Sequence, residues 1–120
     1  MFSVAADTTR NILFMKMEGF MKEDMLMQFA KEVESTVKQL RRGFNVINDI
    51  SNLKATPKNA TEFVKSAHRS LADHGVDKVI RITGSSITTM QFRRTAKEVS
   101  RYEAIEVGSM EEALSLVQAS

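Results

Sequence analysis

Residues 44–51 read FNVINDIS, a short run of apolar and β-branched residues that stops at an aspartate and a serine. Helical patterns precede and follow this run. It therefore predicts a central strand of a parallel sheet, buried on both faces. Open α/β sheets place their working surface at the carboxyl ends of such strands. We therefore expect the functional edge of the sheet near Asp49 and Ser51.

The residues before this strand predict a β-hairpin and one amphipathic helix. Residues 2–6 alternate apolar with small or polar side chains, residues 7–11 supply turn chemistry, and residues 12–17 are apolar again. From residue 23 to residue 40 the apolar positions recur with the 3.6-residue spacing of a helix. The RRG sequence at 41–43 is typical of a helix end.

The residues after this strand predict three more helices and two more strands. Thr56 as cap and Pro57 as first helical residue begin the second helix, which ends at Gly75. Ser109 caps the last helix, with Glu112 completing a capping box. The remaining elements are strands at 76–82 and 102–107 and a helix at about 88–100.

The element order β-β-α-β-α-β-α-β-α predicts an α/β fold with a mixed, mainly parallel sheet. Strands that alternate with helices require crossover connections, so we expect about five strands and four helices. The amino-terminal β-hairpin adds the antiparallel edge strand. A length of 120 residues suits one domain, residues 1–120.

Composition excludes several functional classes. The chain has no cysteine, which rules out disulfides, thiolate catalysis and Cys-ligated zinc. Its net charge of +2 does not by itself indicate a nucleic-acid partner. No apolar run reaches the ~20 residues of a membrane span, and no export signal is evident. We expect a cytoplasmic protein with no metal and no cofactor, and an enzyme is the least favoured class.

The element order, together with the segments ILFMKMEGFM, FNVINDISNL, GVDKVIRITGSS and YEAIEVGSMEEAL, resembles the STAS domain. This domain is shared by bacterial anti-sigma factor antagonists and sulfate transporter tails, and the chain is similar in particular to small, stand-alone bacterial STAS-like proteins. The resemblance implies a non-enzymatic regulator that binds a protein partner, such as a kinase-like anti-sigma factor.

One segment departs from the pattern of phosphorylated anti-sigma factor antagonists. Those proteins carry an Asp-Ser-Ser-Gly type sequence at the start of the helix after this strand, and the target serine of the kinase lies there. The corresponding stretch here reads NLKATPKNAT. The resemblance therefore does not carry the phosphorylation switch over to this chain.

Two polar segments are candidate binding sites. The first is a partner-binding edge, where a phosphate on Ser51 could pair with a neighbouring lysine; its residues are Asp49, Ser51, Asn52, Lys54, Thr56 and Lys58. The second follows the next strand and could hold an anion on backbone N–H groups and hydroxyls; its residues are Thr83, Gly84, Ser85 and Ser86. Each segment also has a simpler interpretation as a turn or loop.

Methionines cluster in the second strand and the first helix. Met21, Met25 and Met27 cannot all be buried by one helix face. They are either core residues or an apolar contact site for a partner, a second copy or a lipid-like ligand. A small apolar or anionic ligand-binding domain is thus the alternative function. We also expect a homodimer. The first helix carries more large apolar side chains than its inner face can bury, so the methionines can meet their symmetry copies. The hairpin also leaves a sheet edge, of which Lys16 and Glu18 guard only the far end and residues 12–15 are unguarded.

Overall fold

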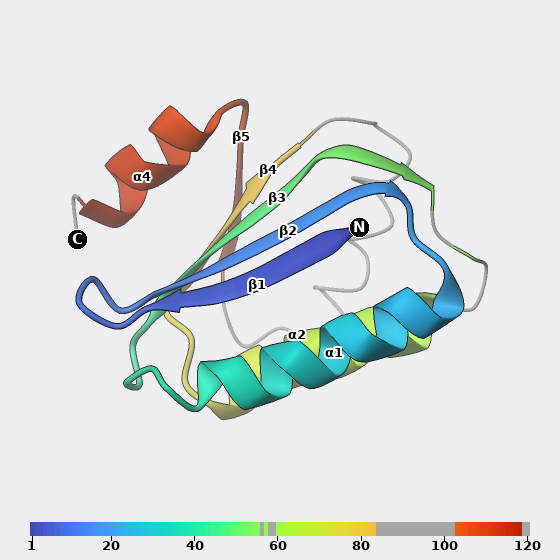
Figure 1. Ribbon diagram of the computed structural model, residues 1–120. Coiled ribbons are helices and arrows are strands. Elements are labelled where there is room, and N and C mark those ends of the chain that lie inside the picture. Colours follow the sequence, from blue (N-terminus) through green and yellow to red (C-terminus); the bar gives the residue numbers. More distant parts are fainter. Residues whose placement is uncertain (56, 58–59, 84–102, 119–120) are drawn as a thin grey trace.

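The structure is a computed structural model that describes residues 1–55, 57, 60–83 and 103–118. Five strands form one mixed sheet in chain order, and only the first strand runs antiparallel to its neighbour (Figure 1). This arrangement confirms the predicted sheet. The strands are β1 (Phe2–Asp7), β2 (Ile12–Phe20), β3 (Asn45–Ala55), β4 (Lys78–Ile82) and β5 (Glu103–Val107).

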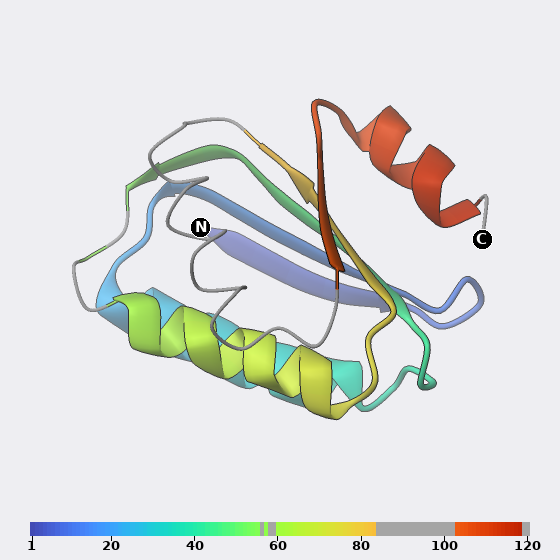
Figure 2. The same ribbon diagram turned by 180° about the vertical axis from the view of Figure 1, so that it is seen from behind.

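The helices cover the two faces of the sheet unequally. Helices α1 (Glu23–Val37) and α2 (Ala60–Asp73) lie side by side on one face, whereas α4 (Met110–Gln118) lies on the other (Figures 1 and 2). The described residues form three helices where we predicted four. The predicted helix at 88–100 lies outside the described residues.

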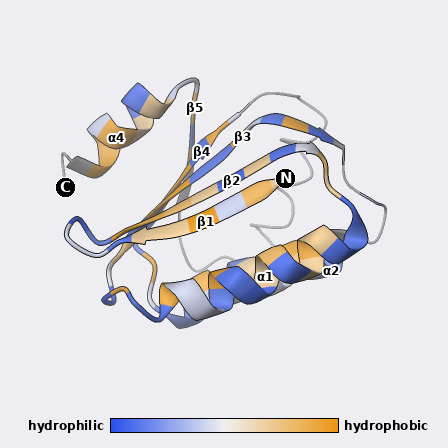
Figure 3. Ribbon diagram, viewed as in Figure 1, coloured by the Kyte–Doolittle hydropathy of each residue, from blue (hydrophilic) through white to orange (hydrophobic). Residues whose placement is uncertain are grey.

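Alternate strand residues build two cores. The larger core fills the space between the sheet and the apolar side of α1 and α2 (Figure 3), and full burial of one such aliphatic side chain contributes about 1.5–3 kcal/mol. The smaller core lies under α4 and consists of Ile12, Ile47, Ile80, Ile82, Ala113 and Val117.

Several predicted boundaries differ from the observed ones. β3 continues to Ala55 and α2 begins only at Ala60, so Pro57 is not the first helical residue. The reason is that β2 continues to Phe20 and keeps pairing with β3 past Ser51. α1 ends at Val37, before the predicted Leu40.

The predicted unguarded edge was wrong. Residues 12–15 pair with β1 on one side and, in register, with Asn45–Asn48 of β3 on the other. They therefore lie in the interior of the sheet. In the described part of the chain the strand at that end of the sheet is β1, which pairs only with β2.

Candidate functional site

The carboxyl end of β3 departs from regular pairing. Lys16 of β2 is the register partner of Asp49, but Glu18 is the partner of Asn52. Two residues of β3, Ile50 and Ser51, therefore oppose the single Met17, which makes a β-bulge. Ile50 is buried in the larger core, whereas Ser51 is half-buried and Asn52 is exposed. The bulge thus turns two adjacent polar side chains outward at this edge.

The bulge is held by the side chain of Asp49. The Ser51 backbone N–H donates to Asp49 Oδ1 at 3.0 Å, and the Ser51 hydroxyl donates to the same oxygen at 2.6 Å. A hydroxyl–carboxylate bond of this length is charge-assisted and stronger than one between neutral groups. Asp49 and Ser51 are therefore one local unit, and a change at Ser51 alters the environment of the Asp49 carboxylate.

Two helices begin at the same edge. α1 follows the end of β2 and α2 follows the end of β3, so their amino-terminal turns lie beside the carboxyl ends of these strands (Figure 1). Lys54 is exposed there. Of the predicted partner-binding residues, the structure brings together Asp49, Ser51, Asn52 and Lys54 on β3, while Thr56 and Lys58 lie outside the described residues.

The predicted anion loop is described only at its first residue. Thr83 is half-buried, and its N–H donates to the carbonyl of Val107 at 3.2 Å. This bond extends the pairing of β4 with β5 by one residue. Gly84, Ser85 and Ser86 lie outside the described residues, so the predicted anion site stays a prediction.

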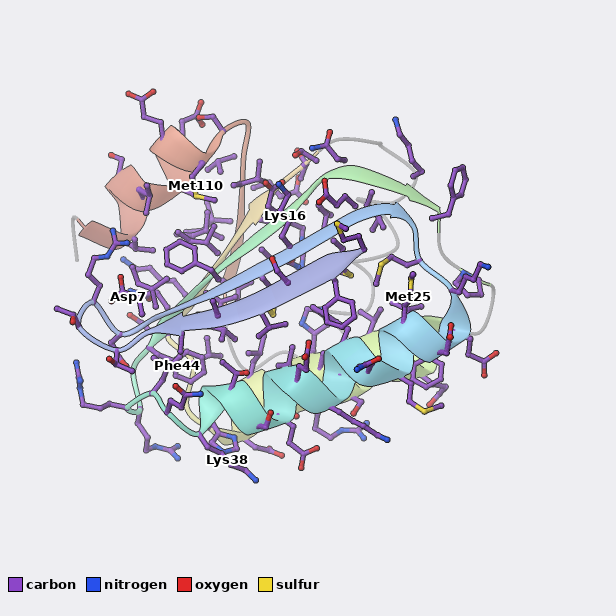
Figure 4. All side chains as sticks on the ribbon, in the orientation of Figure 1. Asp7, Lys16, Met25, Lys38, Phe44 and Met110 are labelled. Atoms are coloured by element: carbon purple, nitrogen blue, oxygen red, sulfur yellow. The ribbon has the colours of Figure 1, made fainter. Side chains whose placement is uncertain are left out.

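The three methionines of the predicted apolar contact occupy different environments. Met21 is buried in the larger core, Met25 is half-buried and packs against that core, and Met27 is exposed. Met25 lies at the amino-terminal end of α1, on the side of the sheet opposite α4 (Figure 4). Only Met27 and the exposed part of Met25 are therefore available to a partner.

Sequence reasoning missed a buried polar group on the face of α1 and α2. Arg81 of β4 is fully buried, in register with Asn48 of β3 and Glu106 of β5, and its Nη1 lies 4.0 Å from Glu106 Oε1. His68 of α2 is buried too. Burial, and to a lesser extent the Arg81 guanidinium, lowers the pKa of His68 to about 3, so His68 is neutral at pH 7.

One signal in the sequence pointed to this group. The run VIRI interrupts an apolar strand with an arginine, and a charge in a doubly covered parallel strand needs a polar neighbour. The group lies beneath α2 and inside the sheet layer. It is therefore a structural element of the core and not a surface for a partner.

No family model and no curated protein matches the sequence. Solved structures do match. The anti-sigma factor antagonist SpoIIAA in its unphosphorylated form is 15% identical with a TM-score of 0.72, and all of both chains is covered. The chain has a STAS-like fold.

Other neighbours agree with the STAS-like fold. An uncharacterised protein with a SpoIIAA-like fold from Shewanella loihica PV-4 has a TM-score of 0.74 at 13% identity, over 97% of this chain and 93% of that one. An anti-sigma factor antagonist from Mycobacterium paratuberculosis has a TM-score of 0.61 at 9% identity, over 98% and 95%. Identities this low show the fold alone.

No described helix combines the length and apolar character that crossing a membrane requires. Nor do the described residues bring three or more His, Asp or Glu side chains together as a metal site. The hydrogen bonds of Ser51 to Asp49 at the bulge of β3 make this polar unit the strongest candidate site in the described part of this STAS-like fold.

Proposed function

We propose that this protein is a non-enzymatic, protein-binding regulator that resembles the anti-sigma factor antagonists. Its contact surface would be the carboxyl edge of the sheet: Asp49–Lys54 of β3, the residues that lead into α2, and the exposed side of α2. The partner would be a regulatory protein, for example a kinase-like anti-sigma factor. The observation that supports this surface is the pair of hydrogen bonds from Ser51 to Asp49 at an outward bulge.

Ser51 would also be the residue through which this surface is regulated. A phosphate at this position would replace the hydroxyl donor by an anion with about −1.5 to −2 charges at pH 7. That anion would lie against Asp49, whose Oδ1 now accepts a hydrogen bond from the Ser51 hydroxyl at an oxygen–oxygen distance of 2.6 Å. The bulge would lose its hydrogen bond and gain a repulsion, so the contact surface would change shape and charge together.

The alternative, a small-ligand binder, has less support. It would need the methionines to line a cavity, but Met15, Met17 and Met21 are buried and fill the larger core. Methionine is well suited to filling irregular core space. A protein contact at the sheet edge accounts better for the outward bulge.

The test is a pull-down from a native extract, followed by titration of the purified partner. Asn52→Arg and Lys54→Glu change exposed side chains of the proposed surface. Each substitution should weaken binding of the partner about tenfold if the substituted residue lies at the centre of the contact. Ser51→Asp should weaken it as well, because a second carboxylate next to Asp49 opens the bulge.

Matched changes at the opposite end of the molecule are the controls. Lys38→Glu and Gln39→Arg alter exposed residues just after α1, and Ser35→Asp introduces a carboxylate on an exposed turn of α1. These variants should bind the partner like the original protein. If they weaken binding as much as the edge variants do, or if the edge variants bind normally while folded, the proposed surface is wrong.

We also propose a homodimer formed through β1. Residues 2–6 of this strand carry no charged side chain, and β1 pairs on one side only in the described part of the chain. Two such edges can pair with each other in antiparallel fashion.

A further inference from the structure

A solvent-facing hollow lies between the end of β5 and the helix that follows it. Val107 of β5 and Glu111, Glu112, Ser115 and Leu116 of α4 line this hollow, which holds about 400 Å³. That volume is near the lower end of the range for small-ligand sites, ~300–1,000 Å³. It suits one side chain of a bound segment better than a whole cofactor.

The hollow has an apolar side and an acidic rim. Leu116 is 36% exposed, although it is a large aliphatic side chain. Glu112 is committed to the helix, since its Oε2 accepts the Gly108 N–H at 3.4 Å. Glu111 beside it is exposed and makes no such cap. An incoming segment would therefore meet Leu116 inside the hollow and the Glu111 carboxylate at its rim.

The lining of the hollow is acidic. Glu111 and Glu112 are the charged side chains among its described lining residues, whereas Glu106 lies on the opposite face of the sheet, beside Arg81. A basic segment would be attracted to this surface, whereas an acidic peptide or a nucleic acid would be repelled. A second copy that used the same edge would bring glutamates against glutamates.

The hollow lies next to an edge of the sheet. β5 pairs with β4, and the described residues place no strand on its other side (Figure 2). Ile105 and Val107 pack on the face that carries α4. A strand added beside β5 would alternate its side chains between the two faces. Every second side chain would therefore point toward α4, and one of them would meet the hollow beside Val107.

We propose that the β5 edge and this hollow bind an extended, basic segment of a partner protein by strand addition. Main-chain hydrogen bonds to β5 would supply affinity, and the hollow would select an aliphatic side chain at one alternate position. A lysine or arginine two residues from that position, on the same face of the added strand, would pair with Glu111. This surface is separate from the Asp49–Ser51 edge, so the proposal can be tested independently of the function proposed above.

The test uses three synthetic peptides and the full chain. The first is Lys-Ser-Val-Ser-Lys-Ser, which places its valine and both lysines on one face of an added strand. The second replaces each lysine by glutamate, and the third is the lysine peptide with alternate backbone nitrogens methylated. The lysine peptide should bind, shift the NMR signals of Leu116 and Ser115, and slow amide exchange in Ile105–Val107. The other two peptides should not bind, because one is repelled and the other cannot form the strand.

Charge variants locate the contact. Glu111→Lys should weaken the lysine peptide about two- to fivefold, the range for one exposed ion pair, and should improve binding of the glutamate peptide. Glu34→Lys, the same change on exposed α1, should alter neither. Equal binding of the methylated peptide would overturn strand addition. Signal changes confined to other elements, or no effect of Glu111→Lys, would overturn the site.

Discussion

At the scale of single residues, His68 is the group whose burial has the clearest consequence. Its folded-state pKa is about 3, whereas an unfolded histidine titrates near 6.5. Between these values the unfolded chain binds a proton that the folded protein excludes. The free energy of unfolding should therefore be unaffected by this residue above pH ~6.5 and fall by up to about 1.4 kcal/mol per unit as pH drops below it.

Urea titrations between pH ~7.5 and ~4.5 measure this dependence. His68→Gln should flatten the fall in stability on the acid side, even if the variant is less stable at every pH. His74→Gln is the control, because His74 is only half-buried and its ring contacts a helix carbonyl. Parallel pH profiles for the original protein and His68→Gln would contradict the assignment.

Some of these individual residues could be predicted from the sequence and others could not. Asp49 and Ser51 could be located because they interrupt the apolar pattern of the strand, although β3 continues past them to Ala55. The run VIRI indicated a buried arginine, but the partners of Arg81 and the burial of His68 could not be derived, since they depend on residues far apart in the chain. Arg81, Asn48 and Glu106 meet only through strand register.

At the scale of elements, helix and strand types could be predicted but their ends could not. Hydrophobic spacing identified α1, α2 and β3, because it depends on which face of each element is buried. Pro57 predicted a helix start that the structure does not have, because continued pairing of β2 and β3 overrides the local preference of proline. Tertiary pairing of this kind leaves no local signal.

The connection from α1 to β3 gives a prediction about backbone conformation. Gly43 has φ +88°, and nothing lies within 4 Å of the position that a Cβ would take. The cost of a substitution is therefore conformational and not steric contact with neighbours. Gly43→Ala should lower the free energy of unfolding by about 1 kcal/mol.

Asparagine at the same position is the matched comparison. Asparagine tolerates a positive φ better than alanine. In urea titrations of both variants, Gly43→Asn should therefore lower the free energy of unfolding clearly less than Gly43→Ala. The explanation fails if asparagine, the larger residue, is the more damaging of the two.

Helix α4 gives a second prediction at this scale. Among its described side chains only Ala113 and Val117 are buried, and its first turn depends on the bond from the Glu112 N–H to the Ser109 Oγ at 3.2 Å. Ser109→Ala should lower the free energy of unfolding by about 1 kcal/mol. Because a thinly packed element opens locally, amide exchange at the helix should accelerate about fivefold while β2 and β3 exchange as before. Ser115→Ala, on the same helix but outside the cap, should not accelerate exchange.

At the scale of the whole molecule, the two ends of the sheet differ in chemistry. The order of the strands could be predicted, because alternating strands and helices allow few arrangements. The antiparallel edge strand was correctly predicted in the hairpin, but residues 12–15 were wrongly assigned to the exposed edge, since β2 pairs with β1 on one side and β3 on the other. β5 has glutamates around its edge, whereas residues 2–6 of β1 have no charge. The two edges therefore suit different partners.

The uncharged β1 edge predicts self-association. Ser3 and Ala5 are small and exposed, so two β1 strands can approach closely and exchange backbone hydrogen bonds. Light scattering at micromolar concentration should give twice the chain mass of 13.5 kDa. Ala5→Lys should shift the protein to monomer without unfolding it, because lysine on an edge strand opposes pairing. Ser66→Lys on exposed α2 adds the same charge away from β1 and should leave the dimer intact. A monomer mass for the original chain would reject this interface.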